Sequence, residues 1–121
     1  MRIVSRILVV VLVTVLLVLT GCSKNSAQDD AFATCLTEKG VTMYGAYWCP
    51  HCQEQKKMFG GSWDKVEYIE CSLPNRAGET AICNQAGITS YPTWQFADGT
   101  RKSGTLSLED LSFFSGCALK E

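Results

Sequence analysis

The sequence is poor in histidine and carries almost no net charge. His51 is the single histidine among 121 residues, and eleven Lys and Arg residues stand against twelve Asp and Glu residues. Such a balance provides no basic surface for a nucleic acid. A single histidine is also too few for the common structural zinc sites, which use two cysteine pairs or one pair with two histidines. We therefore expect neither a nucleic-acid partner nor a bound metal.

Apolar residues are concentrated at the N-terminus, after Arg2 and Arg6. The stretch 7–19 is apolar apart from one threonine, and small residues then lead to Cys22. This order is typical of an export signal. The stretch Leu19-Thr20-Gly21-Cys22 resembles the lipobox of bacterial lipoproteins, in which cleavage precedes a cysteine that takes the lipid. Residues 1–21 are predicted to be a lipoprotein-type signal peptide with Cys22 lipidated, or alternatively an uncleaved membrane anchor.

Both interpretations of the N-terminus deliver the protein outside the cytoplasm, to a bacterial periplasm or cell surface, and keep it attached to the membrane. From Cys22 onward nine Lys and Arg remain against twelve acidic residues, a net charge of about −3. Six more cysteines follow, and an even count in a small exported chain indicates disulfide bonds in an oxidising compartment. These cysteines are Cys35, Cys49, Cys52, Cys71, Cys83 and Cys117.

The rest of the chain divides into a polar tether, residues 22–30, and one domain, residues 31–121. Apolar spacing, glycines and prolines predict helices alternating with strands. This alternation predicts an α/β fold with a mixed central sheet of about four strands, flanked by helices. Helices are expected near 32–39, 50–59, 77–86 and from Ser107, where Asp110 completes a loose capping box; strands are expected near 41–47, 66–71, 92–97 and 100–104.

Cys49 and Cys52 form a Cys-x-x-Cys pair at the junction of a predicted strand and helix. A c-type haem would need a histidine directly after the pair, and Gln53 stands there instead. The remaining alternatives are a structural disulfide and a redox-active pair. The helix N-terminus favours an anion at Cys49, and Pro50 suits the first helical turn. A stabilised thiolate is both a nucleophile and a good leaving group, so redox exchange is the preferred interpretation.

His51, between the two cysteines, can add positive charge beside Cys49, although it could equally be an exposed residue without a role. Trp48 could pack in the core or form a rim of the site. In the redox interpretation, Cys49 is the exposed nucleophile and Cys52, one helical turn later, resolves the mixed disulfide. Pro50 and His51 then tune the pair.

The stretches Met43 to Cys52, MYGAYWCPHC, and Ile88 to Trp94, ITSYPTW, resemble the thioredoxin superfamily. The likeness covers nearly all of residues 31–117. It implies a thioredoxin-like fold in which Pro92 is cis and lies against the active cysteines, with Tyr91 before it. Pro92, Tyr91 and Trp48 would then shape the substrate groove.

Within that superfamily, the chain is most similar to the thioredoxin-like domains fused to bacterial homologues of vitamin K epoxide reductase. This resemblance implies transfer of electrons from folding substrates to a separate vitamin K epoxide reductase-like or DsbB-like membrane reductase that is linked to quinone. The Cys-Pro-His-Cys sequence also resembles that of periplasmic oxidases of the DsbA type. Thioredoxins place a buried acid where Met43 stands here, so proton transfer at Cys52 must use water or another group, with Glu70 as a candidate.

The other four cysteines allow three pairings. Cys71 and Cys83 lie close in sequence, at the end of a strand and on the core face of a helix, so a bridge between them is easy. Cys35 and Cys117 then remain to join the first helix to the C-terminal end. A buried free thiol at Cys35 is the alternative.

The preferred function is therefore a membrane-tethered thiol-disulfide oxidoreductase that acts on protein thiols and disulfides, as a monomer and without a dissociable cofactor. The alternative is a non-catalytic copper chaperone or lipoprotein adaptor on the same scaffold. A copper site would want a further histidine or methionine near the pair, and Met58 lies about two turns along the helix.

Overall fold

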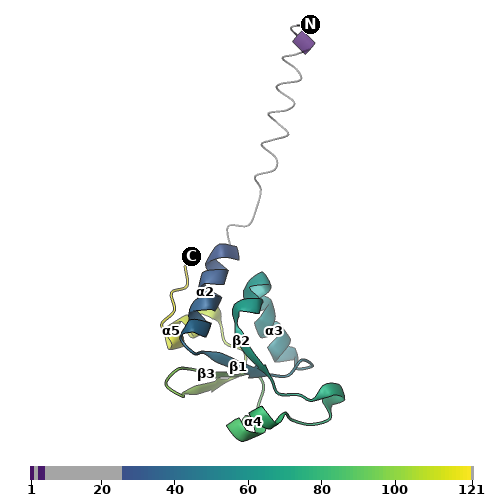
Figure 1. Cartoon of the computed structure of the whole chain (residues 1–121). Coiled ribbons are helices and arrows are strands. Elements are labelled where there is room, and N and C mark those ends of the chain that lie inside the picture. Colours follow the sequence, from purple (N-terminus) through teal and green to yellow (C-terminus); the bar gives the residue numbers. More distant parts are fainter. Residues whose placement is uncertain (2, 5–25, 121) are drawn as a thin grey trace.

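The structure is a computed structural model that describes residues 1, 3–4 and 26–120 (Figure 1). Most of the predicted signal peptide, the predicted lipidation site Cys22 and the first part of the predicted tether lie outside the described residues. Within the described part of the chain, no helix is long and apolar enough to cross a membrane.

The domain alternates helices and strands in the order expected from the sequence. Two short 3-10 helices, η2 (Gly60–Lys65) and η3 (Pro74–Arg76), lie in the connections that follow α3 and β2. The helices are α2 (Ser26–Glu38), α3 (Pro50–Phe59), α4 (Ala81–Ala86) and α5 (Leu108–Ser115), and the strands are β1 (Thr42–Gly45), β2 (Glu67–Glu70), β3 (Thr93–Gln95) and β4 (Arg101–Ser103).

The four strands form one mixed sheet in the order β2-β1-β3-β4. Strands β1 and β2 are parallel, which requires a crossover connection, and α3 supplies it. The pairs β1–β3 and β3–β4 are antiparallel. The α/β class and the mixed sheet predicted from the alternating pattern are confirmed.

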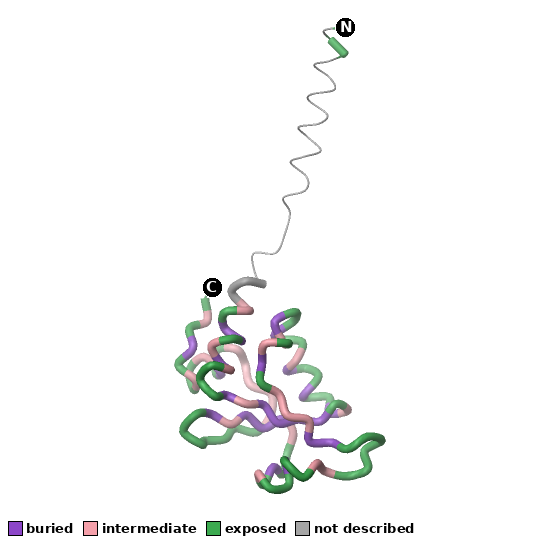
Figure 2. The backbone as a smooth tube through the Cα atoms, viewed as in Figure 1, coloured by how far each residue is buried: buried purple, intermediate pink, exposed green. Residues whose placement is uncertain are grey.

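Helices cover both faces of the sheet (Figure 1). One core cluster joins residues of α2, α3 and α5 to the face that carries Met43 and Trp94. The second, smaller cluster holds Tyr44, Cys83 and Ile88 and places α4 against the opposite face. Side chains alternate between the faces of a strand, so neighbouring residues of β1 serve different clusters. Figure 2 shows the resulting burial along the central strand.

Two disulfides brace this arrangement. Cys35 of α2 is bonded to Cys117, after α5, with their Cα atoms 5.9 Å apart. Cys71, directly after β2, is bonded to Cys83 of α4, with a Cα separation of 5.4 Å. This is the pairing that the sequence analysis favoured. The first bond joins α2 to the chain after α5, and the second joins the end of β2 to α4.

Two helices differ from expectation in length. Helix α2 begins at Ser26, so the second half of the predicted tether is helical. Tertiary contacts hold the end of this segment, because Asp30 accepts a hydrogen bond from Ser62 and pairs with Lys65. Helix α4 covers only Ala81–Ala86, whereas 77–86 was expected.

The missing turns of α4 are replaced by an extended return segment. Leu73 N donates to Gly78 O, and Thr80 N donates to Cys71 O, which keeps the chain alongside the end of β2. Gly78 has φ +140, a conformation that residues with a side chain rarely adopt. At α5 the predicted cap is present, because the Ser107 side chain accepts a hydrogen bond from Asp110 N at 3.0 Å.

Candidate active site

The Cys-x-x-Cys pair lies where β1 passes into α3. Cys49 is the N-cap of α3 with an extended backbone, and Pro50 occupies the first turn. Cys49 N donates to Ala46 O at 3.0 Å, and Gln53 N donates to Cys49 O at 3.1 Å as the helix begins. The side chain of Gln53 also donates to Tyr47 O. These hydrogen bonds fix Cys49 at the helix N-terminus, where the helix dipole favours negative charge.

The thiol of Cys49 is free but largely covered. Cys49 is only 6% exposed, so the expectation of an exposed nucleophile is wrong for this structure. The cover comes from the chain before β3, because Cys49 Sγ donates a hydrogen bond to Tyr91 O at 3.6 Å. The peptide bond between Tyr91 and Pro92 is cis, and Pro92 is fully buried. The structure thus brings Pro92 and the first cysteine together, as the resemblance implied.

Cys52 is also free and has no exposed surface. Burial raises the pKa of the Cys52 thiol to about 12, and the neighbouring Cys49 acts in the same direction. A backbone hydrogen bond from Ala46 and the charge of Lys56 oppose this shift. The two thiols therefore differ in surroundings: Cys49 is at the edge of the site beside Tyr91 and Cys52 is inside.

Gly45, the last residue of β1, makes room for Cys52. A Cβ atom at Gly45 would lie 2.9 Å from Cys52 Sγ and 2.9 Å from Cε2 of Tyr68, closer than real Cβ contacts. Only a residue without a side chain lets both groups approach the strand this closely. Sequence reasoning missed this position, because a glycine at a strand end gives no sign of what packs against it.

His51 and Pro50 lie on the outer side of the pair. The His51 side chain is 70% exposed, and its Nδ1 is 4.0 Å from Oε2 of Glu54. Its imidazole therefore faces solvent and an acidic neighbour, while its backbone oxygen accepts a hydrogen bond from Thr105. Pro50 is exposed. The tuning role of His51 stays a prediction.

Trp48 and Tyr91 form an aromatic wall beside Cys49. Their rings meet edge to face with centroids 6.2 Å apart. Trp48 Nε1 donates to Ser72 Oγ at 2.8 Å, and the guanidinium of Arg76 lies over the indole at 4.9 Å. The Tyr91 hydroxyl donates to Glu79, and burial followed by the charge of Glu79 raises the pKa of Tyr91. The wall is thus fixed to the 71–83 segment that the disulfide closes.

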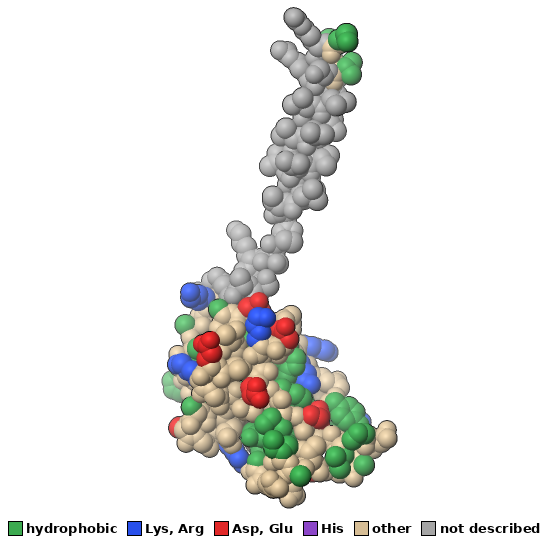
Figure 3. All heavy atoms as spheres, viewed as in Figure 1, with side chains coloured by type: hydrophobic (Ala, Val, Ile, Leu, Met, Phe, Trp, Pro, Cys, Tyr) green, Lys and Arg blue, Asp and Glu red, His purple; other side chains and the backbone are tan. Residues whose placement is uncertain are grey.

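The surface around this wall is partly apolar. Hydrophobic side chains gather on the end of the molecule that carries α4 (Figure 3). Tyr47, next to Trp48, and Leu73, next to Ser72, are exposed large hydrophobic residues at 45% and 39%, and Ile82 of α4 is 53% exposed.

Both carboxylate oxygens of Glu70, the candidate proton acceptor for Cys52, accept hydrogen bonds from other groups. Its Oε1 accepts hydrogen bonds from Tyr47 N at 3.2 Å and Ser72 N at 2.9 Å, and its Oε2 accepts one from the Tyr68 hydroxyl at 2.7 Å. Glu70 therefore ties the end of β2 to the segment before Cys49.

Gln55 is a second residue that sequence reasoning missed. It is fully buried on α3, where its amide donates to Leu106 O at 2.9 Å. Its Oε1 accepts hydrogen bonds from Leu106 N at 2.8 Å and from Trp94 Nε1 at 3.1 Å. Gln55 thus fixes α3, and with it the cysteine pair, to β3 and the connection before α5.

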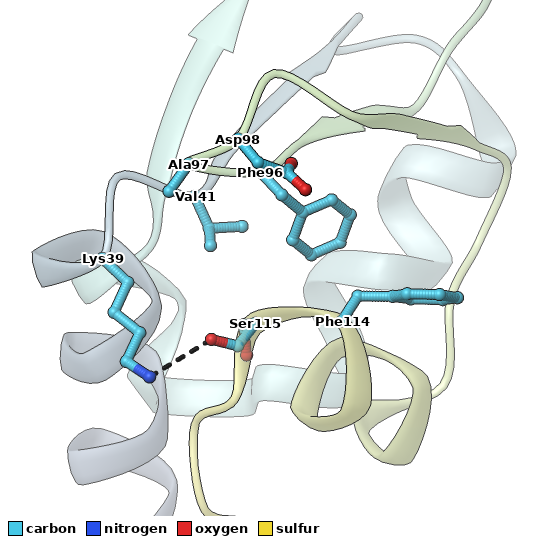
Figure 4. A pocket seen from close by; sticks show the side chains of 7 residues that line it. All are labelled: Lys39, Val41, Phe96, Ala97, Asp98, Phe114 and Ser115. Atoms are coloured by element: carbon cyan, nitrogen blue, oxygen red, sulfur yellow. Dashed lines mark hydrogen bonds between the residues drawn. The ribbon is translucent and has the colours of Figure 1, made fainter.

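Away from the cysteine pair, a cavity of about 280 Å³ lies between the end of α2, the turn after β3 and α5. Figure 4 shows Lys39 reaching across it toward Ser115, whose backbone oxygen accepts a hydrogen bond at 3.2 Å. No residue of the pair lines it. Within the described residues, no group of three or more His, Cys, Asp or Glu side chains is arranged to hold a metal ion.

Fold and site together define a thioredoxin-like protein with a dithiol at the start of a helix and a cis-proline beside it. Two relatives agree with this class. Over 103 residues, 82% of this chain, the sequence is 38% identical to thiol-disulfide oxidoreductase LTO1 of Arabidopsis thaliana and covers 27% of it. Mycoredoxin 1 of Corynebacterium glutamicum is 30% identical over 69 residues, which cover 57% of this chain and 85% of that protein.

The chain therefore belongs to the thioredoxin-like superfamily of thiol-disulfide oxidoreductases. It spans about a quarter of the length of the Arabidopsis relative, at 27%. No protein-family model matches the chain. Among solved structures, oxidized thioredoxin O2 from Arabidopsis thaliana covers 81% of this chain and 92% of its own, with 16% identity and a TM-score of 0.40.

Proposed function

We propose that this protein is an extracytoplasmic, membrane-tethered thiol-disulfide oxidoreductase that oxidises protein thiols. The observation that carries the proposal is the pair of free thiols at the start of α3, with Cys49 Sγ 3.6 Å from Tyr91 O in front of the cis-proline. Cys49 acts as the nucleophile and Cys52 as the resolving thiol. Pro50 and His51 tune the pair, and Trp48, Tyr91 and Pro92 shape the substrate groove.

The reaction is two successive exchanges. A substrate thiolate attacks Cys49 of the Cys49–Cys52 disulfide, so a substrate–Cys49 bond forms and Cys52 leaves with the electron pair. A second substrate thiolate then attacks the substrate sulfur of this mixed disulfide, and Cys49 leaves as a thiolate. The substrate loses two electrons and gains a disulfide, and the protein becomes the dithiol. The backbone of Tyr91 lies beside Cys49, and we place an extended substrate segment along it.

The position of Cys49 at the N-cap of α3 supports the oxidising direction. A thiolate at a helix N-terminus is stabilised, which favours the reduced form and makes the disulfide a stronger oxidant. The dithiol must then be reoxidised, and a quinone-linked membrane reductase of the vitamin K epoxide reductase-like or DsbB-like type is the partner that the sequence resemblance implies. Attachment through Cys22 or through an N-terminal anchor would hold the two proteins at the same membrane.

Two further disulfides support a location outside the cytoplasm. Cys35–Cys117 and Cys71–Cys83 join elements of the folded domain, and bonds of this kind persist mainly in oxidising compartments. The N-terminal apolar run of the sequence supports the same location. Mass spectrometry of the mature N-terminus tests it: a lipid on Cys22 is expected, and a chain that starts at Met1 in a cytoplasmic fraction contradicts it.

A redox titration of the Cys49–Cys52 pair tests the direction. We expect a reduction potential well above the roughly −270 mV of thioredoxin, and a value near that figure contradicts the oxidase proposal. Oxidative refolding of a reduced substrate protein tests the activity itself. The rate should be lost in Cys49→Ser, whereas the matched surface variant Ser115→Ala, at the far cavity, should keep it. Activity that survives Cys49→Ser would contradict the assigned nucleophile.

A further inference from the structure

The thiol of Cys52 exchanges a proton during each catalytic cycle, yet it has no contact with solvent. It is fully buried, and Met43, the β1 side chain on the same face of the sheet, cannot accept a proton. The pKa of Cys52 is raised to about 12, mainly by burial. The thiol therefore needs a neighbouring group that carries its proton, and the side chains around it show which group is in position.

Tyr68 is the polar side chain that shares the Gly45 site with Cys52. The point where a Gly45 Cβ would stand is 2.9 Å from both Cys52 Sγ and Cε2 of Tyr68. The sulfur and this ring atom are thus separated by no more than twice that distance. Cε2 is bonded to the carbon that carries the hydroxyl, so the hydroxyl oxygen is two bonds from the ring atom that packs at Gly45.

The Tyr68 hydroxyl leads from this buried site to a carboxylate near the surface. It donates to Glu70 Oε2 at 2.7 Å, and burial together with Glu70 raises the pKa of Tyr68. The other oxygen of Glu70 is held by the backbone groups of Tyr47 and Ser72. Glu70 itself is only partly buried, so it can exchange protons with water.

Charged neighbours favour this arrangement. Lys56 follows Cys52 by one turn of α3, and its Nζ lies 4.1 Å from the centre of the Tyr68 ring. An ammonium over a ring face is attracted to the ring and favours negative charge nearby. The titratable groups that influence the site are Cys49 at the N-cap of α3, Lys56 on α3, Tyr68 and Glu70 from β2, and Tyr91 from the segment before β3.

We propose that Tyr68 and Glu70 form the proton path of Cys52: the Tyr68 hydroxyl passes a proton between the Cys52 thiol and the Glu70 carboxylate, which exchanges it with solvent. This path rests on the proposed function, because it serves the resolving step of Cys52. It uses β2, the strand next to β1, in place of an acidic side chain at Met43.

The proton path acts when a disulfide oxidises the Cys49–Cys52 dithiol. Cys49 first forms a mixed disulfide, and one thiolate of the oxidant leaves. Cys52 then gives its proton to the Tyr68 oxygen while Tyr68 gives its own proton to Glu70, and the Cys52 sulfur attacks Cys49. The Cys49–Cys52 bond forms, the bond from Cys49 to the oxidant breaks, and the second thiolate leaves with the electron pair. Protonated Glu70 afterwards releases its proton to water.

The reaction of the reduced protein with 5,5′-dithiobis(2-nitrobenzoate) separates the two steps. Attack by Cys49 releases the first coloured thiolate, and resolution by Cys52 releases the second. In Tyr68→Phe, which keeps the ring but lacks the hydroxyl, we expect the second phase to slow by at least about tenfold at neutral pH, as for loss of an acid-base group. The first phase should stay within about twofold of wild type.

The pH profile separates a proton path from a structural role. Without the path, Cys52 depends on hydroxide, so the second phase of Tyr68→Phe should accelerate about tenfold per pH unit, more steeply than in wild type. Glu70→Gln, whose amide oxygen can still accept the bonds from Tyr47 and Ser72, should behave in the same way and carries the test if Tyr68→Phe does not fold. Tyr44→Phe, on the opposite face of β1, is the matched control.

A second phase with wild-type rate and pH profile in Tyr68→Phe and Glu70→Gln would overturn the proton path and leave the proposed function intact. A uniform slowing with an unchanged pH profile would also overturn it, because only the packing would have changed. If the wild-type protein shows no second phase, the assignment of Cys52 as the resolving thiol fails first, and the proton path fails with it.

Discussion

Trp94 Nε1 donates a hydrogen bond to Gln55 Oε1 at 3.1 Å inside the main core, where both residues are fully buried. The same amide oxygen accepts a bond from Leu106 N, and the amide nitrogen donates to Leu106 O. One side chain on α3 thus satisfies three polar groups on β3 and on the connection to α5. The orientation of α3 determines where both cysteines lie, so this buried amide is part of the framework of the site.

Replacing Gln55 by alanine should destabilise the domain strongly. The change leaves the Trp94 and Leu106 groups without partners in the core, and each unsatisfied buried group costs about 1 to 3 kcal/mol. We expect a loss of about 3 kcal/mol or more in urea unfolding. Gln53→Ala, on the exposed side of the same helix with a single bond to Tyr47 O, is the control and should cost about 1 kcal/mol or less. Equal effects of the two changes would contradict the assigned role.

Gly45→Ala should disturb the resolving thiol. The added Cβ would lie 2.9 Å from Cys52 Sγ and 3.3 Å from Cε of Met43, and overpacking of this kind costs about 1 to 3 kcal/mol. Chemical unfolding measures the loss, and the second phase of the thiol reaction should slow at the same time. Gly61→Ala has no atom within 4 Å of the new Cβ and provides the control. A fully stable Gly45→Ala protein would show that the close approach is absent in solution.

Loss of the two structural disulfides should have unequal effects. The Cys35–Cys117 bond spans 82 residues and Cys71–Cys83 spans 12. In the chain-entropy model, loops of these sizes correspond to stabilisation of about 4.5 and about 3 kcal/mol. Thermal unfolding of the paired serine variants should therefore show the larger drop for Cys35→Ser with Cys117→Ser. Disulfide exchange at Cys49 should persist in the folded fraction of both variants, and the reverse order of stability would contradict the loop-length argument.

Stability should fall at alkaline pH because of Cys52. Burial raises its pKa from 9.0 to about 12, so above about pH 9 the unfolded chain releases a proton that the folded chain retains. The unfolded state is then favoured, and the free energy of unfolding should decrease by at most about 1.4 kcal/mol per pH unit up to about pH 12. Urea titrations of Cys49→Ser, with Cys52 as a free thiol, measure this slope without a reductant.

The control for the alkaline slope is Cys49→Ser combined with Cys52→Ser. Serine does not ionise in this range, and all other groups, including Tyr68, are common to both proteins. We expect a flatter profile for the double variant between about pH 9 and pH 11. Identical profiles would show that the Cys52 thiol is more accessible to water than its burial indicates.

Local signals in the sequence were sufficient for much of the fold. The alternation of apolar segments predicted the element order, and Ser107 with Asp110 marked the start of α5 correctly. The segment 77–80 was predicted wrongly as helix because its composition permits one. Its extended form depends on hydrogen bonds to the end of β2, such as Thr80 N to Cys71 O, which no local pattern contains.

The candidate site was also predicted only in part from local sequence signals. The Cys49–Cys52 spacing and Pro50 identified the pair from sequence, because a helix start is a local feature. Three other features of the site join segments far apart in the chain. Tyr91 covers Cys49, Tyr68 packs close to Cys52, and the Gln55 side chain bonds to Leu106. Such contacts follow from the packing of α3 against the sheet.

By itself the sequence determined the cysteine-rich composition of this chain and the dithiol at the beginning of a helix, because spacing and composition act over a few residues. The tertiary structure decided which thiol is covered by the cis-proline segment and which is enclosed behind Gly45. It also decided that the Tyr68 ring lies beside Cys52 at Gly45 and that the Tyr68 hydroxyl donates to Glu70. These relationships depend on how β1, β2 and α3 stack, since side chains that are adjacent in space there are separated by many residues in sequence.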